Sequence, residues 1–334
     1  MSTILVTGGL GYIGSHTVVE LQAAGHHVVV VDNLSNTNAE VADRINTITN
    51  TPFAFHKLDV CDTEALAQVI QQHEVDGIIH FAAYKAVGES VEQPIKYYQN
   101  NINGLISVQD CMKRFDIKNL VFSSSCTVYG DTKESPITED QPIVQAISPY
   151  GTTKIIGEQL LADFAQVTDT RIVSLRYFNP VGAHKTALIG ELPLGVPNNL
   201  VPYITQTAAG IRKKLTIFGR DYNTPDGTNI RDFIHVVDLA KAHVKAIDFC
   251  ETNTFGLEVF NIGTGVGHSV LEVVNAFELH NKLQLNYDFG DRRAGDVEQI
   301  WADTSKAKSV LGWESELGLE EMMQSAWNWQ KQLS

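Results

Sequence analysis

Short apolar runs rich in β-branched residues alternate with longer segments of helical periodicity through the first half of the chain. Such runs predict parallel strands, because a strand that is buried on both faces carries no regular polar side. The predicted strands are residues 3–7, 27–32, 53–59, 76–82, 119–125 and 171–177, and the predicted helices are 12–24, 62–72, 94–114 and 149–166. This alternating order is typical of an α/β fold, so we predict a doubly wound parallel sheet with right-handed crossovers.

The pattern becomes less regular after residue 179. Loop-forming Gly, Pro and Asn concentrate in 180–200, and 221–229 and 288–296 are also predicted loops. Shorter predicted elements lie among them, namely strands at 215–218 and 258–263 and helices near 198–212, 236–250, 268–280 and 317–332. We therefore predict a first domain over 1–179, to which 236–262 returns, and a smaller C-terminal α/β lobe made by 180–235 and 263–334.

The overall charge narrows the range of partners. The 334 residues include 25 Lys and Arg against 39 Asp and Glu, and the net charge of −14 argues against nucleic acid or an anionic membrane as a partner. An anionic small ligand would need a local cluster of Arg or Lys. The chain begins with no signal-peptide pattern, and no apolar run approaches the roughly 18 residues that a membrane span requires.

The cysteines and histidines give little support for a metal site. The four cysteines lie far apart and form no C-x-x-C pair, so disulfide and zinc-binding interpretations are both weak. His80 and His235 lie in apolar segments and are predicted to be core residues rather than ligands. We predict no metal and a location in the reducing cytoplasm.

A glycine-rich segment, TGGLGYIG at residues 7–14, follows the first predicted strand and opens the first predicted helix. Its glycines align as G-x-G-x-x-G from Gly9 or as G-x-x-G-x-x-G from Gly8, and both patterns permit close backbone approach to a pyrophosphate. Asp32, eighteen residues after Gly14, ends the second strand and can accept hydrogen bonds from a ribose 2′-hydroxyl. We predict a Rossmann-like site that prefers NAD to NADP; a glycine-rich turn that binds no cofactor is the alternative.

Two Tyr–Lys pairs with the spacing Y-x-x-x-K compete for the role of a catalytic base. Tyr150 and Lys154 follow Ser148 and a proline, a good helix start, and positions i and i+4 share one face of a helix. Tyr129 and Lys133 lead instead into a proline-containing loop. We predict that Tyr150 is the base and Tyr129 is structural; an ordinary amphipathic helix pair is the alternative for Tyr150.

The environment of Tyr150 is expected to lower its pKa from the ordinary value of about 10. The positive charge of Lys154, the first turn of a helix and an oxidised nicotinamide would each act in this direction. A serine hydroxyl at the carboxyl end of strand 119–125 could hydrogen-bond the reacting alcohol. Ser125 is the best placed of the three serines there. The alternative for Ser125 is a serine that caps its own backbone.

The glycine-rich turn, the serine and Y-x-x-x-K together resemble the extended short-chain dehydrogenase/reductase superfamily. Longer strings over nearly the whole chain resemble its UDP-glucose (UDP-galactose) 4-epimerase family, namely HFAAYKAVGES (80–90), FSSSCTVYGD (122–131), SPYGTTK (148–154), LRYFNPVGAH (175–184), PNNLVPYI (197–204) and DGTNIRDFIHVVDLA (226–240). The resemblance implies reversible interconversion of UDP-galactose and UDP-glucose through a 4-keto intermediate and bound NAD. It also implies a homodimer joined by two helices of each subunit, for which 94–114 and 149–166 are the candidates.

The resemblance assigns roles to individual residues. Tyr150 is the base, Lys154 holds the nicotinamide ribose and lowers the pKa of that Tyr, and Ser125 contacts the sugar O4. The implied cofactor-binding residues are Gly8, Gly11, Tyr12, Ile13, Gly14, Asp32, Asn33, Asp59, Val60, Phe81, Ala82, Ala83, Lys85, Asn100, Ser125, Tyr150, Lys154 and Phe178. The implied UDP-sugar-binding residues are Ser125, Tyr150, Asn179, Asn199, Leu200, Phe218, Arg231, Arg293 and Asp296.

Two rival functions stay open at this point. A dehydratase or net dehydrogenase could use the same scaffold, but related dehydratases carry an Asp-Glu pair where this chain has Cys126 and Thr127. An NAD-binding regulator is the second rival, and such proteins often lack the Tyr or the Lys. The chain also has Ile300 where several family members have a Tyr or Cys that gates the sugar pocket, which leaves acceptance of UDP-N-acetyl sugars open. The resemblance implies that Arg231 and Arg293 bind the diphosphate. The alternative is that both are ordinary surface arginines.

Overall fold

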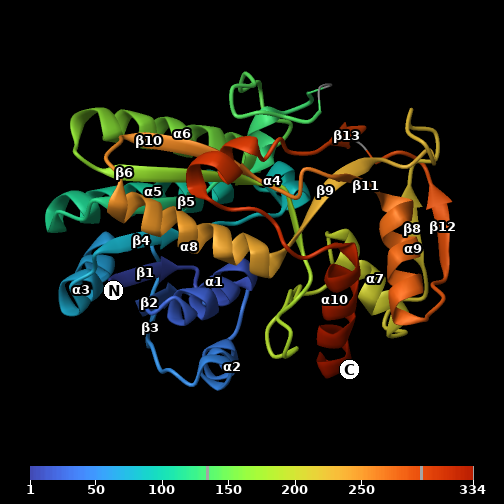
Figure 1. Ribbon diagram of the computed structural model, residues 1–334, viewed down its shortest axis with the longest axis horizontal. Coiled ribbons are helices and arrows are strands. Elements are labelled where there is room, and N and C mark those ends of the chain that lie inside the picture. The colour runs from blue at the N-terminus through green and yellow to red at the C-terminus, as the bar shows by residue number, and fades with distance from the viewer. Residues whose placement is uncertain (133–134, 294–295, 334) are drawn as a thin grey trace.

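A seven-stranded, entirely parallel sheet forms the centre of the computed structural model, which describes residues 1–132, 135–293 and 296–333 (Figure 1). The strand order is β10-β6-β5-β4-β1-β2-β3. The strands are β1 (Thr3–Thr7), β2 (His27–Asp32), β3 (Ala54–Lys57), β4 (Gly77–His80), β5 (Asn119–Ser123), β6 (Arg171–Tyr177) and β10 (Leu257–Ile262). The order reverses between β1 and β4, and in open α/β sheets ligands bind at the carboxyl ends of strands beside such a point.

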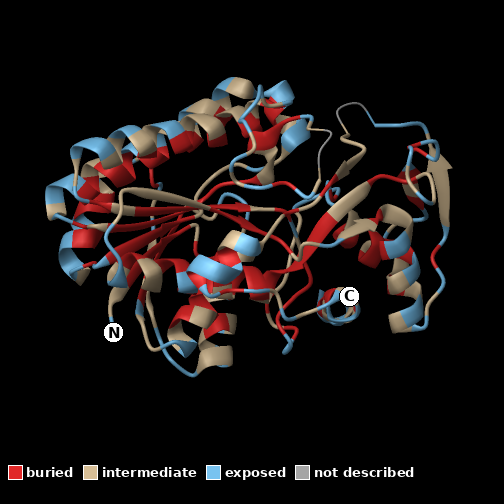
Figure 2. Cartoon of the chain, turned by 45° about the horizontal axis from the view of Figure 1, so that its top comes forward, coloured by how far each residue is buried: buried red, intermediate tan, exposed pale blue. Residues whose placement is uncertain are grey.

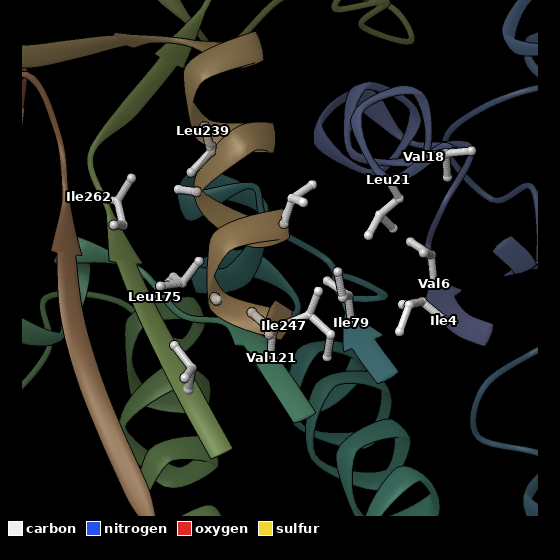
Figure 3. Close-up of a cluster of buried hydrophobic side chains, with 14 of the residues drawn as sticks. Ile4, Val6, Val18, Leu21, Ile79, Val121, Leu175, Leu239, Ile247 and Ile262 are labelled. Carbon is white, nitrogen blue, oxygen red and sulfur yellow. The ribbon is translucent and has the colours of Figure 1, made fainter. Parts of the chain in front are cut away.

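Helices cover both faces of this sheet, which confirms the predicted doubly wound, Rossmann-like α/β architecture. One face packs against α1 (Tyr12–Ala23), α2 (Glu40–Thr49) and α8 (Val236–Thr252), and the other against α3 (Thr63–His73), α5 (Pro94–Phe115) and α6 (Pro149–Val167). The side chains of β1 alternate between the two layers, because successive residues of a strand point to opposite faces. Ile4 and Val6 lie beneath α1 and α8 (Figure 3), whereas Leu5 lies in the other layer.

The central strands are buried along most of their length, while the outer surfaces of the helices are exposed (Figure 2). Each fully buried Leu, Ile or Val side chain contributes roughly 1.5–3 kcal/mol relative to an exposed one. The apolar runs that predicted the strands are therefore also the main source of the stability of this domain.

A smaller region follows β6 and contains short sheets and three helices. A four-stranded sheet comprises β7 (Asn179–Val181), β9 (Ile230–His235), β11 (Gly267–Ser269) and β13 (Gln299–Ile300), and β8 (Leu215–Phe218) pairs with β12 (Tyr287–Gly290). Its helices are α7 (Leu200–Ala208), α9 (Val270–Asn281) and α10 (Leu319–Leu333). The remaining short elements are α4 (Val87–Glu92), η1 (Cys126–Tyr129) and η2 (Ala307–Leu311).

Several predicted elements differ from the structure. The predicted loop at 288–296 is wrong at its start, because β12 continues to Gly290, and the helix predicted near 198–212 ends at Ala208. Neither α2 nor β9 was predicted. The domain boundaries stay a prediction, although α8 packs on the central sheet and β10 pairs with β6 in it.

Candidate active site

The glycine-rich turn between β1 and α1 needs its glycines for steric reasons. Gly8 has φ +70°, and a Cβ at this position would lie 2.9 Å from the backbone nitrogen of Ala82. A Cβ at Gly14 would lie 2.2 Å from the carbonyl oxygen of Gly8. The N-terminus of α1 has no side-chain cap, so its first amides are available to an anion. The turn therefore suits a pyrophosphate.

A cavity beside this turn brings most of the predicted cofactor residues together. Those that line it are Gly8, Gly11, Tyr12, Ile13, Gly14, Asp32, Asn33, Val60, Phe81, Ala82, Ala83, Lys85, Asn100, Tyr150 and Lys154. Three predicted residues, Asp59, Ser125 and Phe178, are not part of its lining. Sequence reasoning missed seven lining residues, namely Val31, Ser35, Asn36, Leu58, Tyr84, Ser123 and Tyr177. Five of them, Val31, Leu58, Tyr84, Ser123 and Tyr177, stand within two residues of the end of a predicted strand, which was the available signal.

Asp32 lies at the carboxyl end of β2 and lines the cavity. One carboxylate oxygen accepts from the backbone nitrogen of Leu10 at 3.1 Å and the other from that of Leu34 at 2.9 Å. Burial raises the pKa of Asp32, and these two hydrogen bonds act against that rise. The carboxylate is thereby fixed where it can accept from a ribose hydroxyl, so the residues present fit a dinucleotide.

Tyr150 and Lys154 lie on the first turns of α6, as predicted. The helix begins at Pro149, and the hydroxyl of Ser148 caps it by accepting from the backbone nitrogen of Gly151 at 3.2 Å. Tyr150 is only 7% exposed and Lys154 only 4%. The Lys154 Nζ lies 5.8 Å from the centre of the Tyr150 ring and donates to the carbonyl oxygen of Ser123 at 2.5 Å.

Burial dominates the electrostatics of this pair. It raises the pKa of Tyr150 above its ordinary value, with a smaller rise from Tyr177 and a lowering from a hydrogen bond with Ser125. It lowers the pKa of Lys154 to about 8, which the charge of Glu158 partly opposes. The predicted net lowering of the pKa of Tyr150 is therefore wrong for the protein without its cofactor, because burial outweighs the groups that would lower it. The remaining predicted contribution is the positive charge of an oxidised nicotinamide.

The rival tyrosine has a structural role, as predicted. Tyr129 is fully buried, and its hydroxyl donates to Oδ1 of Asn261 at 2.7 Å and accepts from Nη1 of Arg176 at 3.0 Å. The partner proposed for it by spacing, Lys133, lies outside the described residues. The phenol of Tyr129 is therefore fully engaged away from the cavity.

Ser125 fits both interpretations that the sequence allowed. It is the N-cap of η1, where its hydroxyl accepts from the backbone nitrogen of Thr127 at 3.2 Å. Its hydroxyl also hydrogen-bonds Tyr150 and lowers the pKa of that phenol. The serine thus links the end of β5 to the candidate base.

Three arginines from two segments lie at β9 and in the loop that follows β12, namely Arg231, Arg292 and Arg293. Burial lowers the pKa of Arg231, the charge of Asp296 raises it and the charge of Arg293 lowers it. Arg293 pairs with Asp296 at 2.7 Å, and Arg231 donates to the carbonyl oxygen of Ile230 at 2.8 Å. Arg292, which was not predicted, lies over the Tyr222 ring at 4.2 Å. Arg231, Arg292 and Arg293 are here called the arginine cluster, and guanidinium groups of this kind are typical of diphosphate sites.

The other predicted UDP-sugar residues lie on separate elements. Asn179 is exposed at the start of β7, Leu200 begins α7, and Phe218 at the end of β8 is 45% exposed. Asn199 donates to Oε1 of Glu191 at 2.6 Å, and Lys85 from the cavity wall pairs with the same oxygen at 3.2 Å. Glu191 therefore connects a predicted cofactor residue with a predicted sugar residue.

Ile300 is buried in a small apolar cluster beside this region. The cluster contains Val128, Tyr129, Ile137, Phe178 and Ala302, and Cys126 packs against it. Phe178 packs in this cluster, and its predicted contact with the cofactor stays a prediction.

Two buried histidines have structural partners, and the described residues show neither a metal site nor a membrane-spanning helix. His80 and His235 are buried and hydrogen-bonded to Thr7 and Ser325, as predicted for core residues. Among residues 1–132, 135–293 and 296–333, no three His, Cys, Asp or Glu side chains gather as they would to hold a metal ion. In the same part of the chain, no helix combines the length and apolar character needed to cross a membrane.

The parallel sheet, the glycine-rich turn and the Ser–Tyr–Lys set define an extended short-chain dehydrogenase/reductase. The family model described as GDP-mannose 4,6 dehydratase matches residues 5–326. The UDP-glucose 4-epimerase of Bacillus subtilis is 51% identical over 98% of this chain and 96% of its own length, and that of Haemophilus influenzae is 50% identical over 98% and 97%. The chain belongs to the UDP-glucose 4-epimerase family of this superfamily.

Solved structures agree with this assignment. The UDP-glucose 4-epimerase of Stenotrophomonas maltophila, with bound NAD and formylated UDP-arabinopyranose, has a TM-score of 0.98 at 47% identity and covers 100% of this chain and 99% of its own. The Bifidobacterium longum UDP-glucose 4-epimerase, in complex with NAD⁺ and UDP, has a TM-score of 0.95 at 46% identity, covering 99% and 98%.

Proposed function

We propose that this protein is a cytoplasmic NAD-dependent isomerase (EC 5.1.3.2) that interconverts UDP-galactose and UDP-glucose in galactose metabolism. The observation that carries the proposal is the placement of Tyr150, Lys154 and Ser125 together at the carboxyl ends of the central strands, beside the glycine-rich turn. Family membership supports the same reaction.

Each of the three residues has a distinct role in this reaction. The Tyr150 phenolate accepts the proton of the sugar O4 and later returns it. The Ser125 hydroxyl, which is hydrogen-bonded to Tyr150, contacts the same O4. Lys154, fixed by the carbonyl oxygen of Ser123, lies where it can hold a ribose hydroxyl. Bound NAD supplies the acceptor and donor for the hydride at C4. The 4-keto sugar rotates within the site, so that C4 is reduced on its opposite face. The reaction therefore causes no net oxidation or reduction of the sugar.

The chemistry beside Ser125 favours epimerisation over dehydration. A dehydratase needs carboxylic acids to remove water, whereas this chain has Cys126 and Thr127 at the corresponding positions. Burial raises the pKa of the Cys126 thiol to about 12, so this group neither donates nor accepts a proton readily near neutral pH. The presence of both Tyr150 and Lys154 likewise favours an enzyme over an NAD-binding regulator.

The arginine cluster is proposed to hold the UDP diphosphate. Replacing Arg231 with Ala is expected to weaken UDP binding roughly 10- to 100-fold, because hydrogen bonds to charged groups contribute about 1.5–3 kcal/mol. Calorimetric titration with UDP measures this, with the NAD content of the protein as a check on the fold. Arg212→Ala is the matched control, since Arg212 lies over Tyr203 and bonds Gln206. Equal weakening in both variants would contradict the assignment.

We also propose a homodimer through α5 and α6. These helices pack side by side, and α5 presents Ile106, which is 47% exposed, on its surface. A second copy would cover such apolar surface, as subunit interfaces commonly do.

The test of the function is incubation of the purified protein with UDP-galactose and no added NAD, followed by chromatography of the products. UDP-glucose is expected to rise to a fixed ratio, because the cofactor is regenerated in each turnover. Accumulation of a keto-sugar or of NADH would point instead to a dehydratase or a dehydrogenase. The same incubation with UDP-N-acetylgalactosamine tests whether Ile300 leaves room for the larger sugar.

A further inference from the structure

We propose that Ser124, through its hydrogen bond to the buried carboxylate of Glu158, is a positioning residue that fixes the serine segment of the active site. This inference deepens the function proposed above and rests on it. The segment Ser123–Ser125 carries the hydroxyl of Ser125 and the carbonyl that holds Lys154. Ser124 itself is fully buried and is not part of the cavity lining.

Glu158 lies on the same face of α6 as the catalytic pair, one turn beyond Lys154 and two turns beyond Tyr150. Its carboxylate is 5% exposed and pairs with Arg176, which is 4% exposed, on β6. Nε of Arg176 lies 3.0 and 3.2 Å from the two carboxylate oxygens, and Nη2 lies 2.6 Å from Oε2. A guanidinium in this forked geometry fixes the orientation of a carboxylate.

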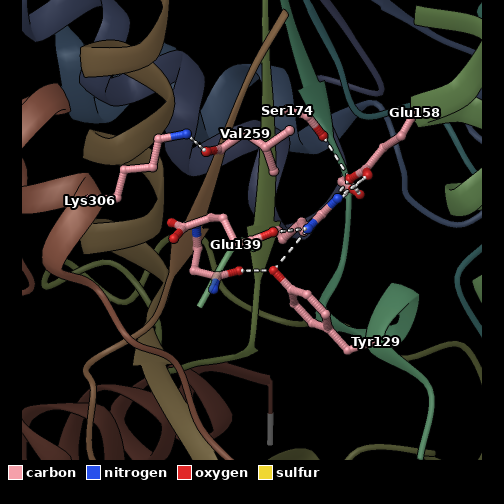
Figure 4. A network of polar contacts seen from close by, with 9 residues as sticks. Tyr129, Glu139, Glu158, Ser174, Val259 and Lys306 are labelled. Carbon is pink, nitrogen blue, oxygen red and sulfur yellow. Dashed lines mark hydrogen bonds and ion pairs between the residues drawn. The ribbon is translucent and has the colours of Figure 1, made fainter. Parts of the chain in front are cut away.

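The position of Arg176 is fixed in turn by groups on its far side. Its Nη1 donates to the hydroxyl of Tyr129 at 3.0 Å and to the carbonyl oxygen of Glu139 at 3.4 Å. Tyr129 is anchored to Asn261 on β10. Figure 4 shows Tyr129 and Glu158 in one network of polar contacts. The carboxylate of Glu158 is thus a fixed point inside the protein.

Ser124 connects this fixed point to the reacting groups. Its hydroxyl donates to Oε1 of Glu158 at 2.6 Å. On one side of it, the carbonyl of Ser123 accepts from Lys154 and the Ser123 hydroxyl bonds Tyr177 at 2.7 Å. On the other side, the hydroxyl of Ser125 bonds Tyr150. Because displacements of about 1 Å can lower a rate on the order of 10²-fold, loss of this anchor should affect catalysis.

Ser174 provides a matched control within the same network. Its hydroxyl donates to the same Oε1 of Glu158 at 3.0 Å, and like Ser124 it is fully buried. Ser174 lies inside β6, and its neighbours Val173 and Leu175 point into the core away from the cavity. Ser124→Ala and Ser174→Ala therefore remove the same kind of bond from the same oxygen, but only Ser124 belongs to the segment that carries the Ser125 hydroxyl and the Ser123 carbonyl.

The test compares kcat, KM and local hydrogen exchange of the two variants, with UDP-galactose as substrate. Ser124→Ala is expected to lower kcat at least 10-fold with KM within twofold, whereas Ser174→Ala keeps kcat within twofold at a similar loss of thermal stability. Amide exchange of the peptide 123–129 should be faster in Ser124→Ala only. Equal kcat in the two variants would overturn the proposal, as would unchanged exchange in this peptide.

A second variant covers the case in which Ser124→Ala does not fold. Ser124→Cys keeps the size of the side chain but has a weak donor, so it should lower kcat and loosen the same peptide to a smaller extent. Wild-type kcat in Ser124→Cys would also overturn the proposal. A wild-type protein without epimerase activity would contradict the proposed function alone, because the exchange comparison still tests the positioning.

Discussion

Replacing Tyr150 with Phe is expected to lower kcat roughly 10³-fold while the protein retains its cofactor. The substitution keeps the aromatic ring, which is 7% exposed and packs beside Lys154, and removes only the group that exchanges a proton with the sugar O4. Initial rates with UDP-galactose, together with the NAD content of the purified variant, measure both parts of the prediction.

Tyr129→Phe is the natural control, because it removes a phenolic hydroxyl with the same Y-x-x-x-K spacing. Its loss leaves Asn261 and Arg176 without one partner each, which should reduce the free energy of unfolding by about 1–3 kcal/mol. Its kcat should stay within 10-fold of the wild type. A nearly fully active Tyr150→Phe protein would contradict the assignment of the base, and equal losses in the two variants would show that the loss in Tyr150→Phe is not specific to a base.

Strands that are buried on both faces were predictable because their whole local sequence is apolar. The segment HVVVVD, now β2, is an example, and its last residue is the acid that faces the cavity. β9 was not predictable in this way, because IRDFIH carries Arg231 and Asp232 in its interior. Asp232 is tolerated there because Thr264, Gly265 and Ala302 donate backbone hydrogen bonds to it. Those donors come from distant parts of the chain, so no local pattern reveals them.

Some features of the candidate site were likewise predictable from local sequence, and others depend on how distant segments pack together. The Tyr150–Lys154 pair was predictable because both residues belong to one helix with an identifiable start. The partner of Lys154, the carbonyl of Ser123, was not, since it requires β5 and α6 to be packed together. The direction of the pKa shift of Tyr150 depends on burial, which spacing does not report.

Lowering the pH from 7.5 to 5.0 is expected to destabilise the fold by several kcal/mol because of buried neutral histidines. Burial lowers the pKa of His16 and His80 to about 3 and that of His235 and His243 to about 4. An unfolded histidine has a pKa near 6.5. The folded state therefore binds fewer protons, so the stabilisation is complete above pH 6.5 and is lost as the pH falls toward 4.

The size of the effect follows from these values. At pH 5.0, each of the four histidines accounts for a loss of about 2 kcal/mol, or roughly 8 kcal/mol together. Buried carboxyls act in the opposite direction, because burial raises the pKa of Asp32, Asp232 and Asp238 and these groups bind protons more readily in the folded state. The net loss should therefore be smaller than the histidine total, which is itself a large part of a typical folding free energy of about 5–15 kcal/mol.

Urea unfolding at the two pH values measures this loss, and single substitutions assign it. His16 is the best probe, because its Nε2 is buried without a hydrogen-bond partner while Nδ1 bonds the carbonyl oxygen of Tyr12 at 2.7 Å. His16→Gln should reduce the difference between pH 7.5 and 5.0 by about 2 kcal/mol, since glutamine does not titrate. The exposed His27 is the control, and His27→Gln should leave the difference unchanged. An identical pH dependence in the wild type and His16→Gln would show that burial of this histidine does not govern acid stability.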